Sequence, residues 1–253
     1  MAMNLNKNYW LSSIMAVVAM AGIFIFDSAR QFILEKVSFI ADKAGQTKNS
    51  LTPTNFREVL GELSDNDSFN YVNKGTLTEN YFRKAEKTLS DGHLYLVISH
   101  TGSAACDIIS VFTGKNFNHA SISFDRELKT AVSYNSGNNV YPPGMNPEML
   151  ADFIRKEGDS MLVYSLPCPP ENKARVLRKI REINERGSAY NMIGLMTKKS
   201  YRPNIMFCSQ FVYNMLETAG LGYFNKRDGT VQPTDFIELD YQRDLTFEYE
   251  VAI

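Results

Sequence analysis

The sequence predicts an α+β fold, with helices packed on an antiparallel β-sheet, preceded by an N-terminal transmembrane helix. Short apolar or alternating runs come in neighbouring pairs, and helical runs follow without a regular strand–helix–strand alternation, which favours an antiparallel sheet. An uncharged apolar run over residues 9–26 indicates the transmembrane helix. We therefore divide the chain into a membrane anchor with a juxtamembrane helix (1–41), a linker with short helices (42–91) and a folded domain (92–253).

The anchor prediction depends on the length and the flanks of the apolar run. About 18 residues span ~27 Å as a helix at ~1.5 Å per residue, just enough for a hydrocarbon core of roughly 30 Å. Tyr9 and Trp10 begin the run, and such aromatic residues favour the membrane interface. A cleaved signal peptide and a buried core helix are the alternatives. Against the signal peptide, the small triplet Ala19-Met20-Ala21 lies inside the run rather than after it.

Charge and cysteine content limit the cellular compartments and the functions that the protein can have. Basic residues after the apolar run outnumber Lys7 before it, which favours a cytoplasmic domain on a single-pass membrane protein. Three widely spaced cysteines, Cys106, Cys168 and Cys208, fit a reducing compartment better than a disulfide framework. A net charge of −1 argues against nucleic-acid binding, which needs clustered basic residues. No Cys or His pair has metal-ligand spacing, so a structural zinc site is not expected.

Strands and helices are expected mainly in the folded domain. Residues 119–124 and 130–135 alternate polar and apolar side chains, as half-buried strands do, and a short connection joins them. The runs 172–186 and 207–219 have the apolar periodicity of helices, and each ends before a glycine. Further strands are expected over residues 94–99, 161–166 and 245–251, and a further helix over residues 104–112.

Cys208 lies at the expected start of the last helix, a position that suits a nucleophilic thiol. Exposed N–H groups and the positive end of the helix dipole stabilise a thiolate in the first turn, and a neighbouring amide can donate to an oxyanion. The competing interpretation is a core cysteine, because Cys208, Phe211, Val212 and Met215 form one apolar helical stripe. From helix position alone, the core interpretation is the stronger one.

His119 opens an alternating strand and is the candidate base. If Phe124 pairs with Thr130 across the hairpin, His119 falls opposite Asn135, and a shift of two residues places it opposite Ser133. Either side chain would hold the imidazole in the tautomer that a general base needs. The competing interpretation is a histidine without a catalytic role, which is the usual case for a lone histidine on a strand.

The two candidate residues lie in runs that carry a family resemblance. The runs NHASISFD (118–125) and FCSQFVYNML (207–216), in this order, resemble the circularly permuted NlpC-type papain-like superfamily, including the YaeF/YiiX-like proteins. In that group a histidine opens a strand, a polar residue follows on the next strand, and a cysteine begins a late helix in a Cys-Ser-x-x-Val setting. Cys208 and its neighbours match that setting, and the resemblance covers roughly residues 92–253.

The chain departs from this pattern at two positions. The third catalytic position in these proteins is often Glu or His, whereas the matching strand here offers Ser133 or Asn135. Gln210 stands where an acidic residue is common. Tyr190, in the run SAYNMIGL, is a candidate to supply a hydroxyl to the oxyanion.

The resemblance implies a papain-like thiol hydrolase. His119 would take the proton from Cys208, the thiolate would attack an amide or ester carbonyl, and water would release the acyl group from the thioester. The family is one of cysteine peptidases and amidases, or acyltransferases where an amine or alcohol replaces water, and no cofactor is implied. The predicted anchor restricts substrates to those near the membrane, such as lipid-linked amides, lipidated proteins or cell-wall peptides. The alternatives are a catalytically silent peptide- or lipid-binding module on the same fold, and a secreted cell-wall peptidase.

Overall fold

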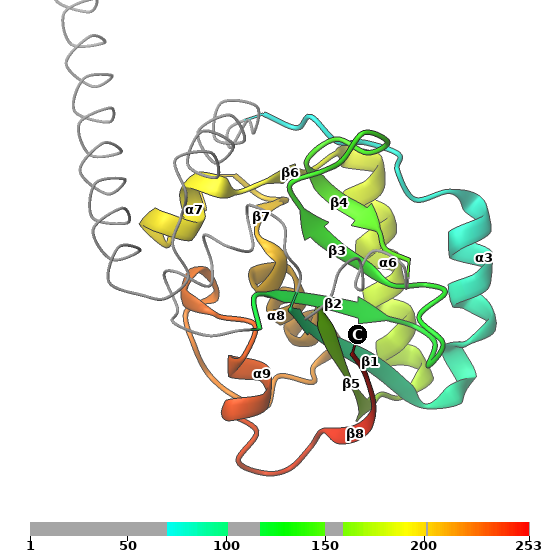
Figure 1. Ribbon diagram of the computed structural model, residues 1–253. Coiled ribbons are helices and arrows are strands. Elements are labelled where there is room, and N and C mark those ends of the chain that lie inside the picture. Colours follow the sequence, from blue (N-terminus) through cyan, green and yellow to red (C-terminus); the bar gives the residue numbers. More distant parts are fainter. Residues whose placement is uncertain (1–69, 101–116, 150–158, 201, 253) are drawn as a thin grey trace, which may run out of the picture. The chain divides into compact units, whose positions relative to one another are not determined.

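Six antiparallel strands form one sheet within the part of the chain that the structure describes, in the order β4-β3-β2-β1-β5-β8 (Figure 1). The computed structural model describes residues 70–100, 117–149, 159–200 and 202–252. The strands of this sheet are β1 (His93–His100), β2 (His119–Ser123), β3 (Val132–Asn135), β4 (Gly144–Pro147), β5 (Ser160–Pro167) and β8 (Thr246–Ala252), and a separate short parallel pair consists of β6 (Ala189–Tyr190) and β7 (Ile205–Met206).

Local sequence signals set the ends of the longer helices. The helix α6 starts in a proline pair, and proline suits the first helical position because that N–H has no partner inside the helix. The helix α8 follows the extended residue Phe207 and ends at Gly220, which has a positive φ of 68°. The helical elements are α3 (Glu79–Lys87), α6 (Pro170–Arg186), α7 (Met192–Thr197), α8 (Cys208–Ala219) and α9 (Asp235–Glu238), with 3₁₀ turns η1 (Leu89–Asp91) and η2 (Asp228–Thr230).

The strand β1 divides its side chains between two apolar layers. Leu96 and Ile98 face the main core, which α3, α6 and α8 also enter. Each of these helices contributes large buried side chains to that core, among them Phe82, Ile180 and Phe211. Tyr95 and Val97 point to the opposite face and join a smaller cluster there. This two-sided burial fixes the register of the strand, because a slip by one residue would exchange the two faces.

The α+β fold with an antiparallel sheet is confirmed. The strands predicted over 94–99, 119–124, 130–135, 161–166 and 245–251 correspond to β1, β2, β3, β5 and β8, and the helices predicted over 172–186 and 207–219 correspond to α6 and α8. The helix predicted over residues 104–112 lies outside the described residues. The strand β4 was not predicted.

Two further features differ from the prediction. The described end of the predicted linker is part of the domain, because Phe82 and Ala85 of α3 are buried against α6, so a boundary at residue 92 is too late. The strand β2 is buried on both faces rather than one. Its polar side chains tolerate burial because they are hydrogen-bonded inside the protein: Ser123 Oγ, for example, donates to the carbonyl oxygen of Asp125.

None of the helices within the described residues combines the length and the apolar character that a membrane span requires. The predicted anchor over residues 9–26 and the juxtamembrane helix up to residue 41 lie outside the described residues.

Candidate active site

A buried carboxylate holds the imidazole of His119. Glu148 follows β4 directly, and its backbone N–H donates to the carbonyl oxygen of Ala131, which extends the pairing of β3 with β4 by one residue. Its Oε1 atom lies 2.7 Å from Nε2 of His119. The two side chains are only 8% and 7% exposed, so water screens this contact little. The pairing of β2, β3 and β4 therefore determines where the imidazole and the carboxylate meet.

Two serine hydroxyls fix the Glu148 carboxylate. Ser133 Oγ donates to Oε1 at 2.5 Å, and Ser121 Oγ donates to Oε2 at 2.5 Å. Both serines are fully buried. They lie on the same face of the sheet as His119, because the β2–β3 register pairs Ile122 with Val132 and so sets Ser121 beside Ser133. With three donors, the carboxylate has its charge satisfied and its orientation fixed.

The pKa values of this pair favour an ionised carboxylate next to a protonated imidazole. Burial by itself would lower the pKa of His119. The charge of Glu148 and the hydrogen bonds to Cys208 and Glu148 outweigh burial and raise that pKa well above its usual range. Burial alone would raise the pKa of Glu148, yet the charge of His119 and the hydrogen bonds from His119, Ser121 and Ser133 lower it.

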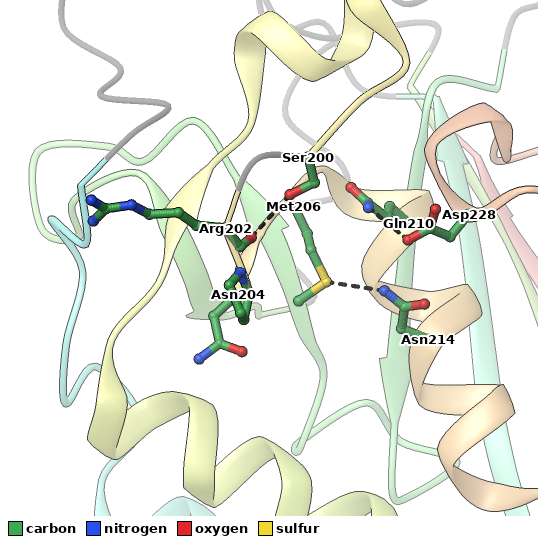
Figure 2. A pocket seen from close by; sticks show the side chains of 8 residues that line it. Ser200, Arg202, Asn204, Met206, Gln210, Asn214 and Asp228 are labelled. Carbon is green, nitrogen blue, oxygen red and sulfur yellow. Dashed lines mark hydrogen bonds between the residues drawn. The ribbon is translucent and has the colours of Figure 1, made fainter.

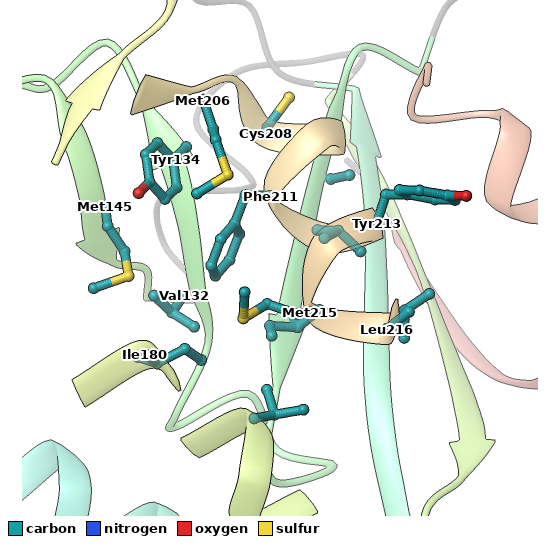
Figure 3. Close-up of a cluster of buried hydrophobic side chains, with 14 of the residues drawn as sticks. Val132, Tyr134, Met145, Ile180, Met206, Cys208, Phe211, Tyr213, Met215 and Leu216 are labelled. Carbon is teal, nitrogen blue, oxygen red and sulfur yellow. The ribbon is translucent and has the colours of Figure 1, made fainter. Parts of the chain in front are cut away.

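Cys208 is the first residue of α8, as the sequence predicted for the helix start within one residue. No side chain in the described part of the chain caps this helix end, because the N-cap residue is Phe207 and the hydroxyl of Ser209 instead donates to the carbonyl oxygen of Val231 at 2.7 Å. The first N–H groups of α8 therefore remain available to stabilise negative charge. Figure 3 shows the sulfur of Cys208 directed away from Phe211 and Met215, although the residue borders the same apolar core.

His119 and Cys208 meet where their elements begin. Cys208 is close enough to the imidazole to help raise the pKa of His119, through hydrogen bonding and through charge. Because Nε2 is engaged by Glu148, Nδ1 is the ring nitrogen left for the thiol. Cys208 has 0% of its surface exposed, and His119 has 7%. A substrate carbonyl can reach the sulfur only if residues that cover it move.

The other residues predicted for the site do not contact the imidazole of His119 in the way that was expected. Asn135 does not hold the imidazole: its carboxamide oxygen accepts from the Gly137 N–H and from Asn146 Nδ2. Ser133 contacts the carboxylate rather than His119, so its part is to orient Glu148. The register that sets His119 opposite Asn135 is the one observed, but Glu148 reaches the ring from the next strand. Tyr190 is buried on β6 and pairs with Met206, two residues before Cys208.

The sequence reasoning missed Glu148. The strand that precedes it has the sequence GMNP, and glycine and proline are poor strand formers. The available signal was spacing: Asn146 and Glu148 are two residues apart, so they would share one face of a strand that paired with β3. The pattern of the family that the sequence resembles, in which Glu is common at the third catalytic position, also indicated a glutamate near His119.

A separate pocket of about 310 Å³ lies beside the start of α8 (Figure 2). Gln210 and Asn214 of α8 line it, together with Met206 and the segment before β7. Cys208 does not line this pocket. Among the described residues, no cluster of three or more His, Cys, Asp or Glu side chains is arranged to hold a metal ion.

Comparisons of the chain with protein-family models, with curated proteins and with solved structures found no match.

Proposed function

We propose that the protein is a cysteine hydrolase of the permuted papain-like kind, which cleaves an amide or ester bond through a thioester on Cys208. The observation that carries the proposal is the series Cys208–His119–Glu148: a thiol at a helix start, an imidazole whose pKa that thiol helps to raise, and a buried carboxylate hydrogen-bonded to the imidazole. Nucleophile, base and orienting group in this order are the arrangement that thiol acyl transfer requires.

Each group has a definite part in the proposed reaction. His119 takes the proton of Cys208 and holds it on Nδ1 as an imidazolium, which the raised pKa of His119 favours, and the sulfur attacks the carbonyl carbon of the substrate. The free N–H groups at the start of α8 donate to the oxyanion. The carbon–nitrogen or carbon–oxygen bond breaks as His119 returns the proton to the leaving group, which leaves a thioester. Water, deprotonated by His119, then attacks the thioester and releases the carboxylic acid.

Glu148 makes this mechanism stronger than the serine or asparagine that the sequence suggested for the third position. A carboxylate stabilises the imidazolium that forms when His119 accepts the proton, whereas a hydroxyl or amide mainly orients the ring. The lowered pKa of Glu148 keeps the carboxylate ionised at neutral pH. The two serine donors hold it in place for that purpose.

One observation favours a second candidate, a catalytically silent binding module on the same fold. The sulfur of Cys208 has no exposed surface, as in a core cysteine. A silent module needs no access to the thiol, whereas a hydrolase needs a conformation in which the thiol is open. The substrates near a membrane that the anchor prediction implies stay a prediction in either case.

Alkylation with iodoacetamide separates the two candidates. A hydrolase predicts that at about pH 7 Cys208 reacts faster than Cys168, because the thiolate is the reactive form. Cys168 is a suitable comparison within the chain, since burial raises the pKa of its thiol to about 11. His119→Ala should slow the reaction of Cys208 and leave Cys168 unchanged. Equal, slow alkylation of both thiols in the native protein would reject the hydrolase.

A further inference from the structure

The pocket beside α8 has a wall rich in hydrogen-bond acceptors. Asp228, at the start of η2, contributes a carboxylate, and Gln210 contributes a carboxamide. Asn214 already directs its amide nitrogen to Met206 Sδ at 3.3 Å, and Asn204 directs its own to the backbone of Gly187. The guanidinium of Arg202 extends away from the other labelled side chains in Figure 2. The lining is therefore suited to groups that donate hydrogen bonds rather than to an apolar chain.

The side chain of Gln210, at this wall, has only one of its two polar atoms in a hydrogen bond among the described residues. Its Nε2 donates to Asp228 Oδ2 at 2.9 Å, and this contact fixes the orientation of the amide because a carboxylate can only accept. The opposite atom, Oε1, is buried and has no hydrogen-bond partner among the described residues, although Gln210 is only 2% exposed. Figure 2 shows this oxygen turned toward Ser200 across the pocket. An unpaired buried carbonyl is unfavourable, so a donor that reached it would be bound tightly for its size.

We infer that this pocket is a recognition subsite for an amide N–H group, donated to Gln210 Oε1 beside Asp228. The pocket adjoins the helix that carries Cys208 but is separate from the thiol, because side chains two residues apart on a helix point in different directions and Cys208 does not line the pocket. The inference goes beyond the proposed function by naming a ligand class for this second site: a molecule that carries a peptide-like amide, bound beside the catalytic helix and away from the thiol. A substrate recognised through an aliphatic acyl chain does not fit a wall of carboxamide and carboxylate groups.

The test measures binding in the full chain with Cys208→Ala, so that no reaction takes place. The probes are N-acetylglycinamide, which carries amide N–H groups, and hexanoate, which carries an aliphatic chain, and ligand-detected NMR titration gives their affinities. We expect N-acetylglycinamide to bind and hexanoate not to displace it. Gln210→Met keeps the length of the side chain without the oxygen and should weaken N-acetylglycinamide binding about tenfold. Gln232→Met, the same change at a glutamine outside the pocket, should leave binding unchanged.

Asp228→Asn provides a second variant in case Gln210→Met does not fold. With Asn at position 228 the Gln210 amide can flip, so that Oε1 accepts from the new amide and no longer faces the pocket, which would also weaken binding of the probe. The inference is overturned if N-acetylglycinamide does not bind, if hexanoate binds in its place, or if the folded variants bind it as the parent does. Because the assay uses no thiol, these outcomes leave the proposed chemistry of Cys208 to its own alkylation test.

Discussion

Glu148→Gln is the substitution that tests the proposed catalytic series most sharply. It keeps the shape of the side chain and removes only the charge that faces His119. In the native protein Oε1 accepts from both Nε2 of His119 and the hydroxyl of Ser133, and Oε2 accepts from Ser121. A carboxamide offers one acceptor oxygen in place of two and is neutral. The imidazolium form of His119 therefore loses its main stabilisation.

The size of the effect follows from the burial of the pair. A hydrogen bond to a charged group contributes about 1.5–3 kcal/mol, and because both side chains are less than a tenth exposed the value is not reduced by solvent screening. Taking about 2 kcal/mol, and a factor of ten for each 1.36 kcal/mol, the alkylation of Cys208 should slow about thirtyfold. The pKa of His119 should fall toward its ordinary value, because the charge that raises it is gone.

The assay is the second-order rate of iodoacetamide alkylation, followed for each cysteine by peptide mass spectrometry across a range of pH. Glu185→Gln, the same change at an exposed position on α6, is the matched control and should leave the rate unchanged. Cys168 reports on general loosening of the structure, since unfolding would accelerate its alkylation too. An unchanged rate at Cys208 in folded Glu148→Gln would refute the role given to the carboxylate.

Three further predictions concern the supports of the site and the fold. Ser121→Ala and Ser133→Ala should each slow the alkylation of Cys208 about fivefold in the same assay, because each removes one donor to the Glu148 carboxylate. An unchanged rate in both variants would contradict the role of the serines in holding this carboxylate. In urea unfolding, the stability gap between the native protein and Glu148→Gln should be largest between the ordinary pKa values of 4.5 and 6.5. It should narrow at higher pH, as His119 deprotonates through its raised pKa, and at lower pH, as the carboxylate protonates; a gap independent of pH would contradict this. Lys173→Met should lower the free energy of unfolding, measured in urea, by about 3 kcal/mol, because the fully buried ammonium donates to two backbone carbonyls and one carboxylate. A loss of stability near zero would contradict a stabilising role for these hydrogen bonds.

The long, periodic elements of the fold were predictable because their pattern is local. The strand β1 is a short continuous apolar run, and the helices α6 and α8 place apolar residues at helical spacing, so each pattern indicates its element directly. The strand β4 was not predictable in the same way. It begins at Gly144, whose φ of 139° disfavours other residues, and a Cβ there would lie 2.7 Å from atoms of Asn73 and Ser188. That glycine is required by a close tertiary approach, which a local pattern does not reveal.

The same distinction applies to the site. The positions of Cys208 and His119 follow from where one helix and one strand begin, which the sequence signals well. The partner of His119 depends on which strand lies next but one in the sheet, and therefore on long-range pairing. Ser133 and Asn135 were predicted as partners because both lie on β3, the neighbour of β2. Glu148 enters from β4 and reaches the imidazole across β3.

The most direct test of the central claim is to trap an acyl-enzyme. The full chain is mixed with p-nitrophenyl acetate, quenched in acid, and mapped by peptide mass spectrometry for an acetyl group on sulfur. The account predicts a thioester on Cys208 that is lost in Cys208→Ser and is formed far more slowly in His119→Ala. It predicts no comparable modification of Cys168, whose thiol has a pKa of about 11. If Cys208 stays unmodified while the protein is folded, or if Cys168 is acetylated as fast, Cys208 is not the nucleophile.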